Sequence, residues 1–198
     1  MVRSLAVAHH PSYVPHMPPA TLQTAQDLLH FRDPGKTAEL VRGVLVVREP
    51  PSTRHGDRAA RLTVRVGAFV EREGLGKVFA QDTGFQIERE PDTVRAPDLA
   101  FVQRDRLAQI QEEGYAEIAP DLVAEILSPN DRAGEVLEKV GQWLSAGVRL
   151  VWVLDAARQH ARVYRADGTV SIVGPDEELG GELVLPGFRC PLGEILST

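Results

Sequence analysis

Apolar residues recur at helical spacing in three stretches of the chain. The clearest stretch is 54–73, whose apolar stripe comprises Ala59, Leu62, Val66, Phe69 and Val70. Shorter patterns of the same period predict helices over 21–31 and 131–146. Gly74 and Gly147 follow two of these stretches, and glycine commonly ends a helix because it adopts left-handed backbone conformations.

Short β-rich runs bounded by turn residues lie between and after these helices. They cover residues 39–47, 77–80, 84–88, 94–102, 121–127, 149–154, 161–165 and 170–173. Gly43 marks a turn or bulge inside the first run, and Asp167-Gly168 predicts a tight hairpin turn. The tail, 183–196, is expected to add a last strand and a final helical turn. Helices with strands on each side predict an α/β or α+β sandwich around a mixed sheet.

The bulk composition is that of an ordinary globular domain. With 198 residues, 43% hydrophobic and 25% charged, the chain can bury a substantial core. Residues 1–20 contain His and Pro without the apolar segment of a signal peptide, so we expect a flexible lead before one domain over 21–198. No stretch approaches the roughly 20 apolar residues that span a bilayer. The single cysteine, Cys190, fits a reducing cytoplasm, which is the expected location.

Charge limits how the chain can meet nucleic acid. The net charge of −6 argues against a protein that coats nucleic acid by electrostatics alone, yet it allows an enzyme with a locally basic groove. A second stripe on the helix over 54–73 consists of Arg54, Arg58, Arg61 and Arg65. This stripe predicts either contact with a phosphate backbone or a solvated face that neighbouring acids partly neutralise.

Two carboxylates lie in otherwise apolar strands. Glu125 interrupts the run 121–127, and Asp98 follows Pro97 at the start of a similar run. A carboxylate in such a run is costly unless a cation or hydrogen bonds meet it. The simplest explanation is a divalent metal bound by Asp98 and Glu125, with the backbone carbonyl of Ile126 as a further ligand. The alternative is that each acid pairs with an arginine.

Three more polar residues accompany these acids. Lys139 borders the apolar stripe of the helix over 131–146, so its ammonium either reaches the metal or lies at the surface. His55 is in register with the inward-facing Ala59, which indicates a buried, satisfied histidine, a base, a phosphate-binding group or a partner of a metal ligand. Glu39 begins a strand and could cap, pair with an arginine or extend the metal site.

The order of these residues resembles the Uma2 family, which is grouped with the PD-(D/E)xK restriction-endonuclease-like nucleases. The resemblance spans roughly residues 22 to 196 and is carried by Glu39–Gly43, Pro50-Pro51, His55, Pro97-Asp98, Leu122–Pro129, Lys139, Trp143, Gly147-Val148 and Val151–Asp155. It implies that Glu39, Asp98 and Glu125 are the acidic site residues, that Lys139 is the catalytic lysine and that His55 is an accessory group.

One position departs from the superfamily signature. The (D/E)xK motif places a lysine two residues after the acid, and that position here is Leu127. Relatives of this kind carry the lysine on the following helix, where Lys139 lies. Trp143 stands where a tyrosine would be expected.

The resemblance also implies a fold and an activity. The expected fold is a restriction-endonuclease-like α/β core, with a mixed central sheet flanked by helices and additional antiparallel strands. The expected activity is hydrolysis of phosphodiester bonds by a Mg²⁺-dependent endonuclease, with Mn²⁺ as a possible substitute. The expected partner is nucleic acid, DNA favoured over RNA, and a homodimer is plausible because many such nucleases pair two sites. The alternatives are a non-catalytic interaction or dimerisation module with a weak metal site, and a hydrolase of smaller phosphate esters.

Overall fold

A six-stranded mixed sheet lies at the centre of this computed structural model, which describes residues 23–197; the lead expected over 1–20 lies outside them. In the spatial order β10-β9-β8-β7-β6-β3, its strands are Val170–Val173, His160–Arg165, Leu150–Asp155, Leu122–Ile126, Leu99–Gln103 and Gly76–Ala80. Strands β7 and β8 are parallel, and the other neighbouring pairs are antiparallel. The predicted mixed sheet is therefore confirmed.

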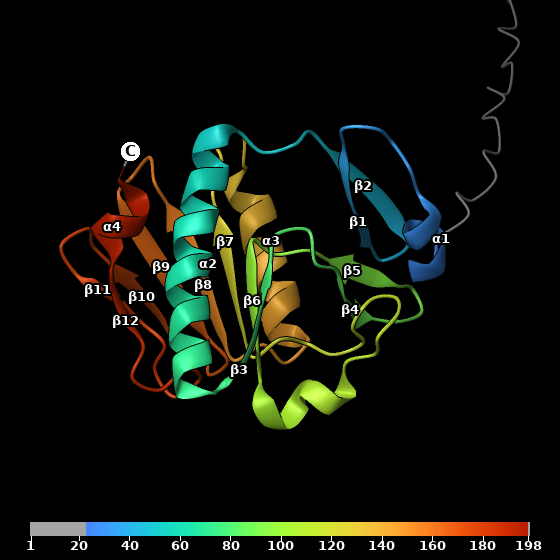
Figure 1. The fold of residues 1–198 in the computed structure, drawn as a ribbon. Helices are drawn as coiled ribbons and strands as arrows, with labels where there is room; N and C mark the ends of the chain where they lie inside the picture. Colours follow the sequence, from blue (N-terminus) through green and yellow to red (C-terminus); the bar gives the residue numbers. More distant parts are fainter. Residues whose placement is uncertain (1–22, 198) are drawn as a thin grey trace, which may run out of the picture.

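Two long helices cover the two faces of this sheet. Helix α2 (Thr53–Glu73) crosses in front of the sheet in Figure 1, and α3 (Ala133–Ser145) lies behind it. Each helix packs into its own core cluster: Leu62 of α2 with Ala124 of β7, and Val140 of α3 with Val123. Because successive side chains of a strand point to opposite faces, Glu125 lies on the α3 face with Val123.

The ends of both helices follow from local chemistry. Ser52 caps α2 by accepting a hydrogen bond from the backbone N–H of His55, and Gly74 ends it in the left-handed conformation. Helix α3 ends at Ser145 with Ala146 as its C-cap, one residue before the predicted cap; Gly147 follows with a φ of 103°. The predicted helices over 54–73 and 131–146 are confirmed to within two residues at each end.

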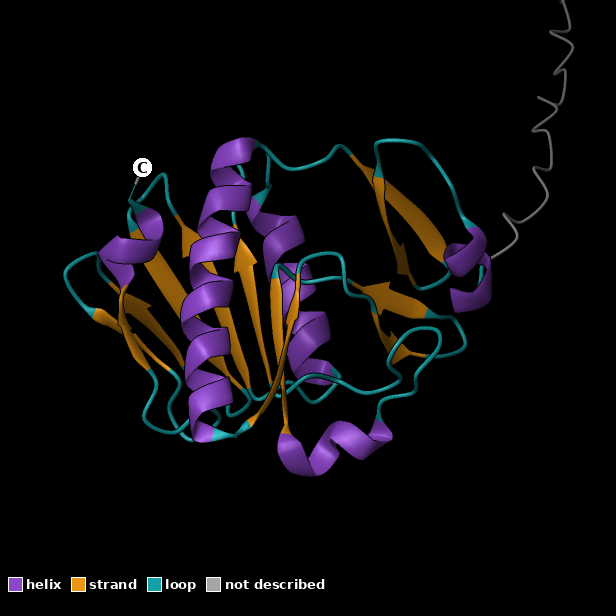
Figure 2. Ribbon diagram, viewed as in Figure 1, coloured by secondary structure: helices purple, strands orange, loops and turns teal. Residues whose placement is uncertain are grey.

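A separate four-stranded antiparallel sheet stands beside the central one (Figure 2). In the order β2-β1-β5-β4, its strands are Val44–Arg48, Thr37–Val41, Thr93–Arg95 and Phe85–Glu88. Helix α1 (Ala25–His30) lies within the predicted helix over 21–31, of which residues 21 and 22 lie outside the described residues. It packs on this sheet through Leu28, which belongs to the core cluster that contains Leu40. Gly43 lies in the turn between β1 and β2, as its position predicts.

The prediction of one strand over 94–102 is wrong. The segment forms two strands, β5 in the four-stranded sheet and β6 in the central sheet, with a break at Ala96–Asp98. Pro97 lacks a backbone N–H and restricts the residue before it, so the chain leaves one sheet and enters the other here. The break places Arg95 and Asp98 where the two sheets meet.

Short elements complete the described residues. They are the 3-10 helix η1 (Arg104–Gln109), the paired strands β11 (Glu178–Gly180) and β12 (Arg189–Pro191), and helix α4 (Leu192–Leu196). The strand and helical turn expected over 183–196 correspond to β12 and α4. Across residues 23–197, no helix combines the length and apolar character needed to cross a membrane.

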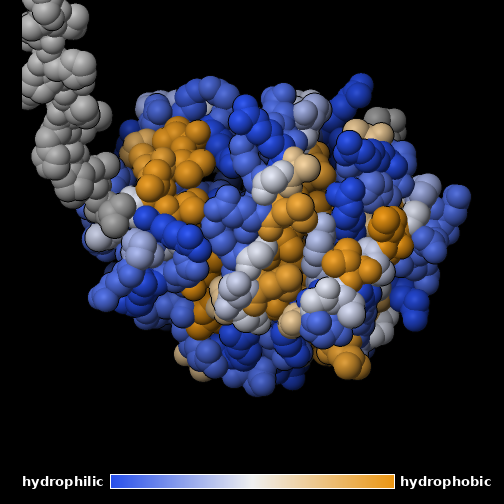
Figure 3. All heavy atoms as spheres, turned by 180° about the vertical axis from the view of Figure 1, so that it is seen from behind, coloured by the Kyte–Doolittle hydropathy of each residue, from blue (hydrophilic) through white to orange (hydrophobic). Residues whose placement is uncertain are grey.

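Hydrophobic patches interrupt a mostly hydrophilic surface when the molecule is seen from behind (Figure 3). The exposed large hydrophobic side chains include Val44 and Val47 of β2, Leu137 of α3, and Val170 and Ile172 of β10. Strands β2 and β10 are both edge strands of their sheets.

Candidate active site

The five polar residues selected from the sequence lie in one connected cluster. Lys139 of α3 contacts both Glu125 of β7 and Glu39 of β1. Asp98, just before β6, contacts His55 of α2. The contacts of Lys139 and the contact of Asp98 with His55 meet on β7. Asp98 accepts a hydrogen bond from the backbone N–H of Ile126, the residue after Glu125. Residues from four elements and from the break before β6 therefore meet where the two sheets adjoin.

Glu125 has a partner on each carboxylate oxygen. Oε1 accepts a hydrogen bond from Trp143 Nε1 at 2.9 Å, and Oε2 accepts one from Lys139 Nζ at 2.8 Å. The side chain is 12% exposed. Burial raises the pKa of Glu125 to about 7; the Lys139 charge opposes this rise, and the charges of Asp98 and Glu39 add to it. The carboxylate is held in a position that penalises its own negative charge.

Lys139 is directed inward by the helical repeat of α3. Lys139, Gln142 and Trp143 are spaced at i, i+3 and i+4, which places them on one side of the helix. The lysine side chain is 20% exposed, and Nζ lies 3.4 Å from Glu39 Oε1 in addition to its bond to Glu125. Burial lowers the pKa of Lys139, but the charges of Glu125 and Glu39 outweigh it and hold that pKa above its ordinary value. Of the two alternatives for this lysine, the structure favours the inward one.

Glu39 belongs to a buried polar chain that includes two residues missed in the sequence. Its Oε2 accepts a hydrogen bond from Arg95 Nη1 at 2.9 Å, and its Oε1 accepts one from the backbone N–H of Ala96 at 2.9 Å. Arg95 also donates from Nε and Nη2 to Gln142 Oε1, at 2.8 and 2.6 Å. Burial raises the pKa of Glu39, but Lys139 and Arg95 outweigh it and keep that pKa below its ordinary value. Glu39 is therefore an ionised group with fixed partners.

His55 joins two of the three predicted metal ligands. Its Nε2 lies 2.9 Å from the carbonyl oxygen of Ile126 and 3.3 Å from Asp98 Oδ2. Asp98 Oδ2 also accepts the Ile126 N–H at 2.6 Å. The pKa of His55 lies above its ordinary value, chiefly because of its hydrogen bond to Asp98, with burial opposing. The predicted inward orientation is confirmed, and Nδ1 finds no partner among residues 23–197.

The donors at this cluster fit a hard divalent cation. Asp98 Oδ2 and the Ile126 carbonyl converge on a single point, now taken by His55 Nε2, and both are oxygen donors of the kind that Mg²⁺ prefers. Glu125 Oε2 supplies another oxygen, now bonded to Lys139. Within the described part of the chain, no three His, Cys, Asp or Glu side chains form a ready-made metal cluster. Two carboxylates, one carbonyl and water could hold the ion once His55 and Lys139 yield these oxygens.

The arginine stripe of α2 is largely engaged by the C-terminal residues. Arg58 donates to the carbonyl of Leu196, Arg61 to Ser197, and Arg65 to Glu194 at 2.9 Å. Arg61 also pairs with Asp57 within the helix. Of the two predictions for this stripe, these contacts favour a solvated face that neighbouring groups neutralise over a surface that binds a phosphate backbone.

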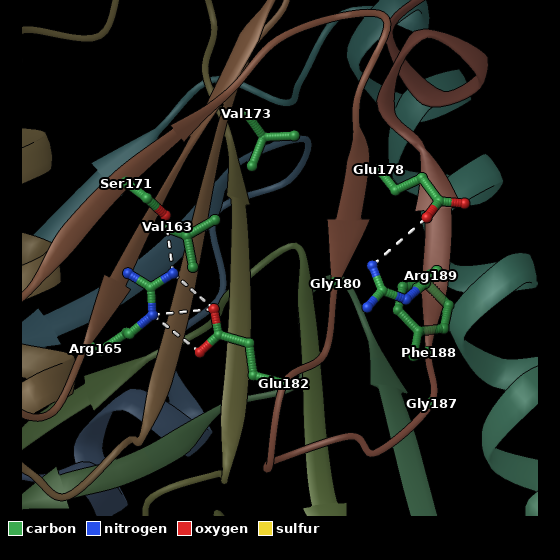
Figure 4. A pocket seen from close by; sticks show the side chains of 10 residues that line it. All are labelled: Val163, Arg165, Ser171, Val173, Glu178, Gly180, Glu182, Gly187, Phe188 and Arg189. Carbon is green, nitrogen blue, oxygen red and sulfur yellow. Dashed lines mark hydrogen bonds and ion pairs between the residues drawn. The ribbon is translucent and has the colours of Figure 1, made fainter.

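A concave region lies away from the acids. A hollow of about 290 Å³ opens between strands β9–β10 and the β11–β12 pair (Figure 4). Phe188 lines it, with the ion pairs Arg165–Glu182 and Arg189–Glu178 on opposite sides. Each of the four charged side chains in its lining is paired with another of them, so the hollow presents no group prepared for catalysis.

Comparison with known proteins bears on both fold and family. No curated protein matches the chain. The crystal structure of a putative nuclease belonging to DUF820 from Anabaena variabilis ATCC 29413 is similar over 88% of this chain and 97% of that chain, with a TM-score of 0.75 and 20% sequence identity. At that identity the likeness is one of fold, and it confirms the nuclease-like α/β architecture. Residues 23–193 match the Uma2 family, described as a putative restriction endonuclease. The match covers most of the sequence, and the chain therefore belongs to the Uma2 family.

Proposed function

We propose that this protein is a metal-dependent endonuclease that hydrolyses phosphodiester bonds of nucleic acid, DNA more readily than RNA. The observation that carries the proposal is the contact of Lys139 with Glu125 beside the converging Asp98 and Ile126 oxygens. Family membership and the nuclease-like fold support the same class of reaction.

The residues divide the chemistry between them. A Mg²⁺ or Mn²⁺ ion held by Asp98, Glu125 and the Ile126 carbonyl would supply an activated water and polarise the phosphoryl group. The water oxygen would bond to phosphorus as the bond from phosphorus to one sugar oxygen breaks; the water would lose one proton to solvent and the departing sugar oxygen would gain one from solvent, which leaves a phosphate monoester and a free hydroxyl. Lys139 stays protonated at neutral pH because its pKa is raised, so it donates to the developing phosphate charge and does not serve as the base. Trp143 fixes the orientation of the Glu125 carboxylate.

Exposed positive charge beside the cluster supports a polymeric phosphate substrate. Arg48 of β2 and Arg132 before α3 lie 3.8 and 3.9 Å from Glu135, one helical turn before Lys139. Their side chains are 47% and 84% exposed and share this one carboxylate at long distances, so each could exchange it for a phosphate. We propose that these two arginines contact phosphates of the substrate.

The test is cleavage of plasmid, single-stranded DNA and RNA with Mg²⁺, Mn²⁺ or a chelator. Wild type would be compared with Glu125→Gln and Lys139→Met, and Glu178→Gln would serve as a control that removes a carboxylate from a distant ion pair. Metal-dependent cutting that is lost in both site variants and kept in the control supports the proposal. Cutting that survives in Glu125→Gln would refute it.

A non-catalytic interaction module is the second candidate. The specific observation in its favour is that Asp98 and Glu125 already have protein partners in His55, Lys139 and Trp143. Metal binding that needs both acids, without hydrolysis of any polymer or nucleotide, would support the module. Turnover of nucleotides without polymer cleavage would instead indicate a hydrolase of smaller phosphate esters. A homodimer and a cytoplasmic location stay predictions; sedimentation would test the first.

A further inference from the structure

Lys139 has two carboxylate partners at unequal distances. Its Nζ donates to Glu125 Oε2 at 2.8 Å and lies 3.4 Å from Glu39 Oε1. The lysine side chain is flexible, so a small rotation exchanges one partner for the other. Glu39 is itself held in place, because Arg95 and the backbone of Ala96 bind its two oxygens.

The present hydrogen bonds of Glu125 conflict with metal binding. Trp143 occupies Oε1 and Lys139 occupies Oε2, so each oxygen already has a donor. A divalent cation bound to Oε2 would lie next to the Lys139 ammonium. Two neighbouring positive charges repel strongly in a half-buried site. Moving the ammonium away without a new partner would leave a buried charge unpaired, which is also costly. Lys139 therefore needs a second acceptor.

We propose that Lys139 transfers its hydrogen bond from Glu125 to Glu39 when a divalent cation binds, so that Glu39 is the counter-ion of the lysine and does not ligate the metal. This inference rests on the proposed function, because it assumes a cation at Asp98 and Glu125. Of the alternatives for Glu39, it selects a positioning residue over an extension of the metal site.

The contacts of Glu39 support this role. Its two oxygens are directed to Arg95, to the Ala96 N–H and to Lys139, and these donors take up the positions that a metal would need. Arg95 and Lys139 also keep Glu39 ionised, so its charge is available before the lysine moves. Glu39 thus satisfies the ammonium without competing for the cation.

A double-mutant cycle of metal affinity tests the proposal without any turnover. Mn²⁺ binding would be measured by calorimetry for wild type, Glu39→Gln, Lys139→Met and the double variant. Lys139→Met should bind Mn²⁺ more tightly, because the competing ammonium is gone. Glu39→Gln should bind it about tenfold more weakly, the usual effect of removing a partner that acts through another residue. The double variant should match Lys139→Met alone.

The outcomes separate this inference from the proposed function. A tenfold loss that persists when Glu39→Gln is added to Lys139→Met would make Glu39 a ligand and overturn the inference. Equal affinities of wild type and Glu39→Gln would overturn it as well. Failure of folded wild type to bind metal, or binding that Asp98→Asn and Glu125→Gln leave unchanged, would overturn the proposed function together with the inference.

A second measurement uses the wild-type chain, so it holds even where a variant folds poorly. The sequence contains three lysines, Lys36, Lys77 and Lys139, so few ammonium signals need to be resolved by ¹⁵N NMR. On titration with Mg²⁺, the Lys139 signal should shift while its ammonium hydrogens stay protected from exchange, because Glu39 accepts the hydrogen bond that Glu125 gives up. Lys36 and Lys77 should not change. Loss of that protection would show that the ammonium moves into solvent and would refute the transfer.

Discussion

Replacing Glu125 with glutamine should make the fold more stable at neutral and alkaline pH. Burial raises the pKa of this carboxyl to about 7 from an ordinary value of 4.5. A folded chain that keeps a proton longer than the unfolded chain loses stability as pH rises between these values. The glutamine side chain does not titrate, so the stability of the Glu125→Gln variant should not show this decline.

The size of the effect follows from the two pKa values. Below pH 4.5 the carboxyl is protonated in both states, and the contribution of Glu125 to stability is constant. Above pH 7 it is ionised in both states, and the wild type carries the full penalty, about 3 kcal/mol for a shift from 4.5 to about 7. The side chain is 12% exposed, so solvent screens little of this cost.

Urea unfolding of wild type and Glu125→Gln, in the presence of a chelator, would measure this stability penalty. The difference in unfolding free energy should move in favour of glutamine by about 2 to 3 kcal/mol between pH 5 and pH 8. Glu178→Gln, which alters an exposed ion pair, should show no such trend. A difference that stays constant across this range would refute the reasoning, because Lys139 would then offset the burial of Glu125 completely.

Three further predictions concern the residues around Glu125. Arg95→Met should lose about 3 to 5 kcal/mol in urea unfolding, because the buried carboxylate of Glu39 would lack its partner; an unchanged midpoint would contradict this. Trp143→Phe should cost about 1 to 3 kcal/mol by the same assay and weaken Mn²⁺ binding, since it removes a hydrogen bond to a buried carboxylate. In DNA binding followed by fluorescence anisotropy, Arg48→Gln should lower the salt slope by about one, whereas Arg61→Gln should leave it unchanged; equal effects would be inconsistent with the engaged state of Arg61.

The elements with strong periodicity could be predicted from the sequence. The helix over 54–73 has a continuous apolar stripe and glycine at its end, and the structure has Thr53–Glu73. The prediction of one strand over 94–102 was wrong. The apolar residues continue across Pro97, but the backbone hydrogen bonding of a strand does not. A hydrophobic pattern does not reveal which sheet a strand joins.

The acids and the lysine of the candidate site were visible because their charge conflicts with their surroundings. Glu125 and Asp98 interrupt apolar runs, and Lys139 borders an apolar stripe. Arg95 and Gln142 carried no such signal, since both types are common at surfaces. Their burial arises only when β5 of one sheet meets α3 on the other, and no local pattern encodes that contact.

The order in which the site residues occur along the chain bears on when the site can exist during synthesis. Glu39 lies 100 residues before Lys139, and Arg95 and Asp98 lie between them. At roughly 5 to 20 residues per second, the ribosome needs on the order of 5 to 20 seconds to pass from Glu39 to Lys139. During that interval Glu39 lacks its partner Lys139, and Glu125, once synthesised, lacks both Lys139 and Trp143. Assembly of the charged cluster therefore waits until α3 has left the ribosome, so a nascent chain that stops short of this helix carries its acids without their cation.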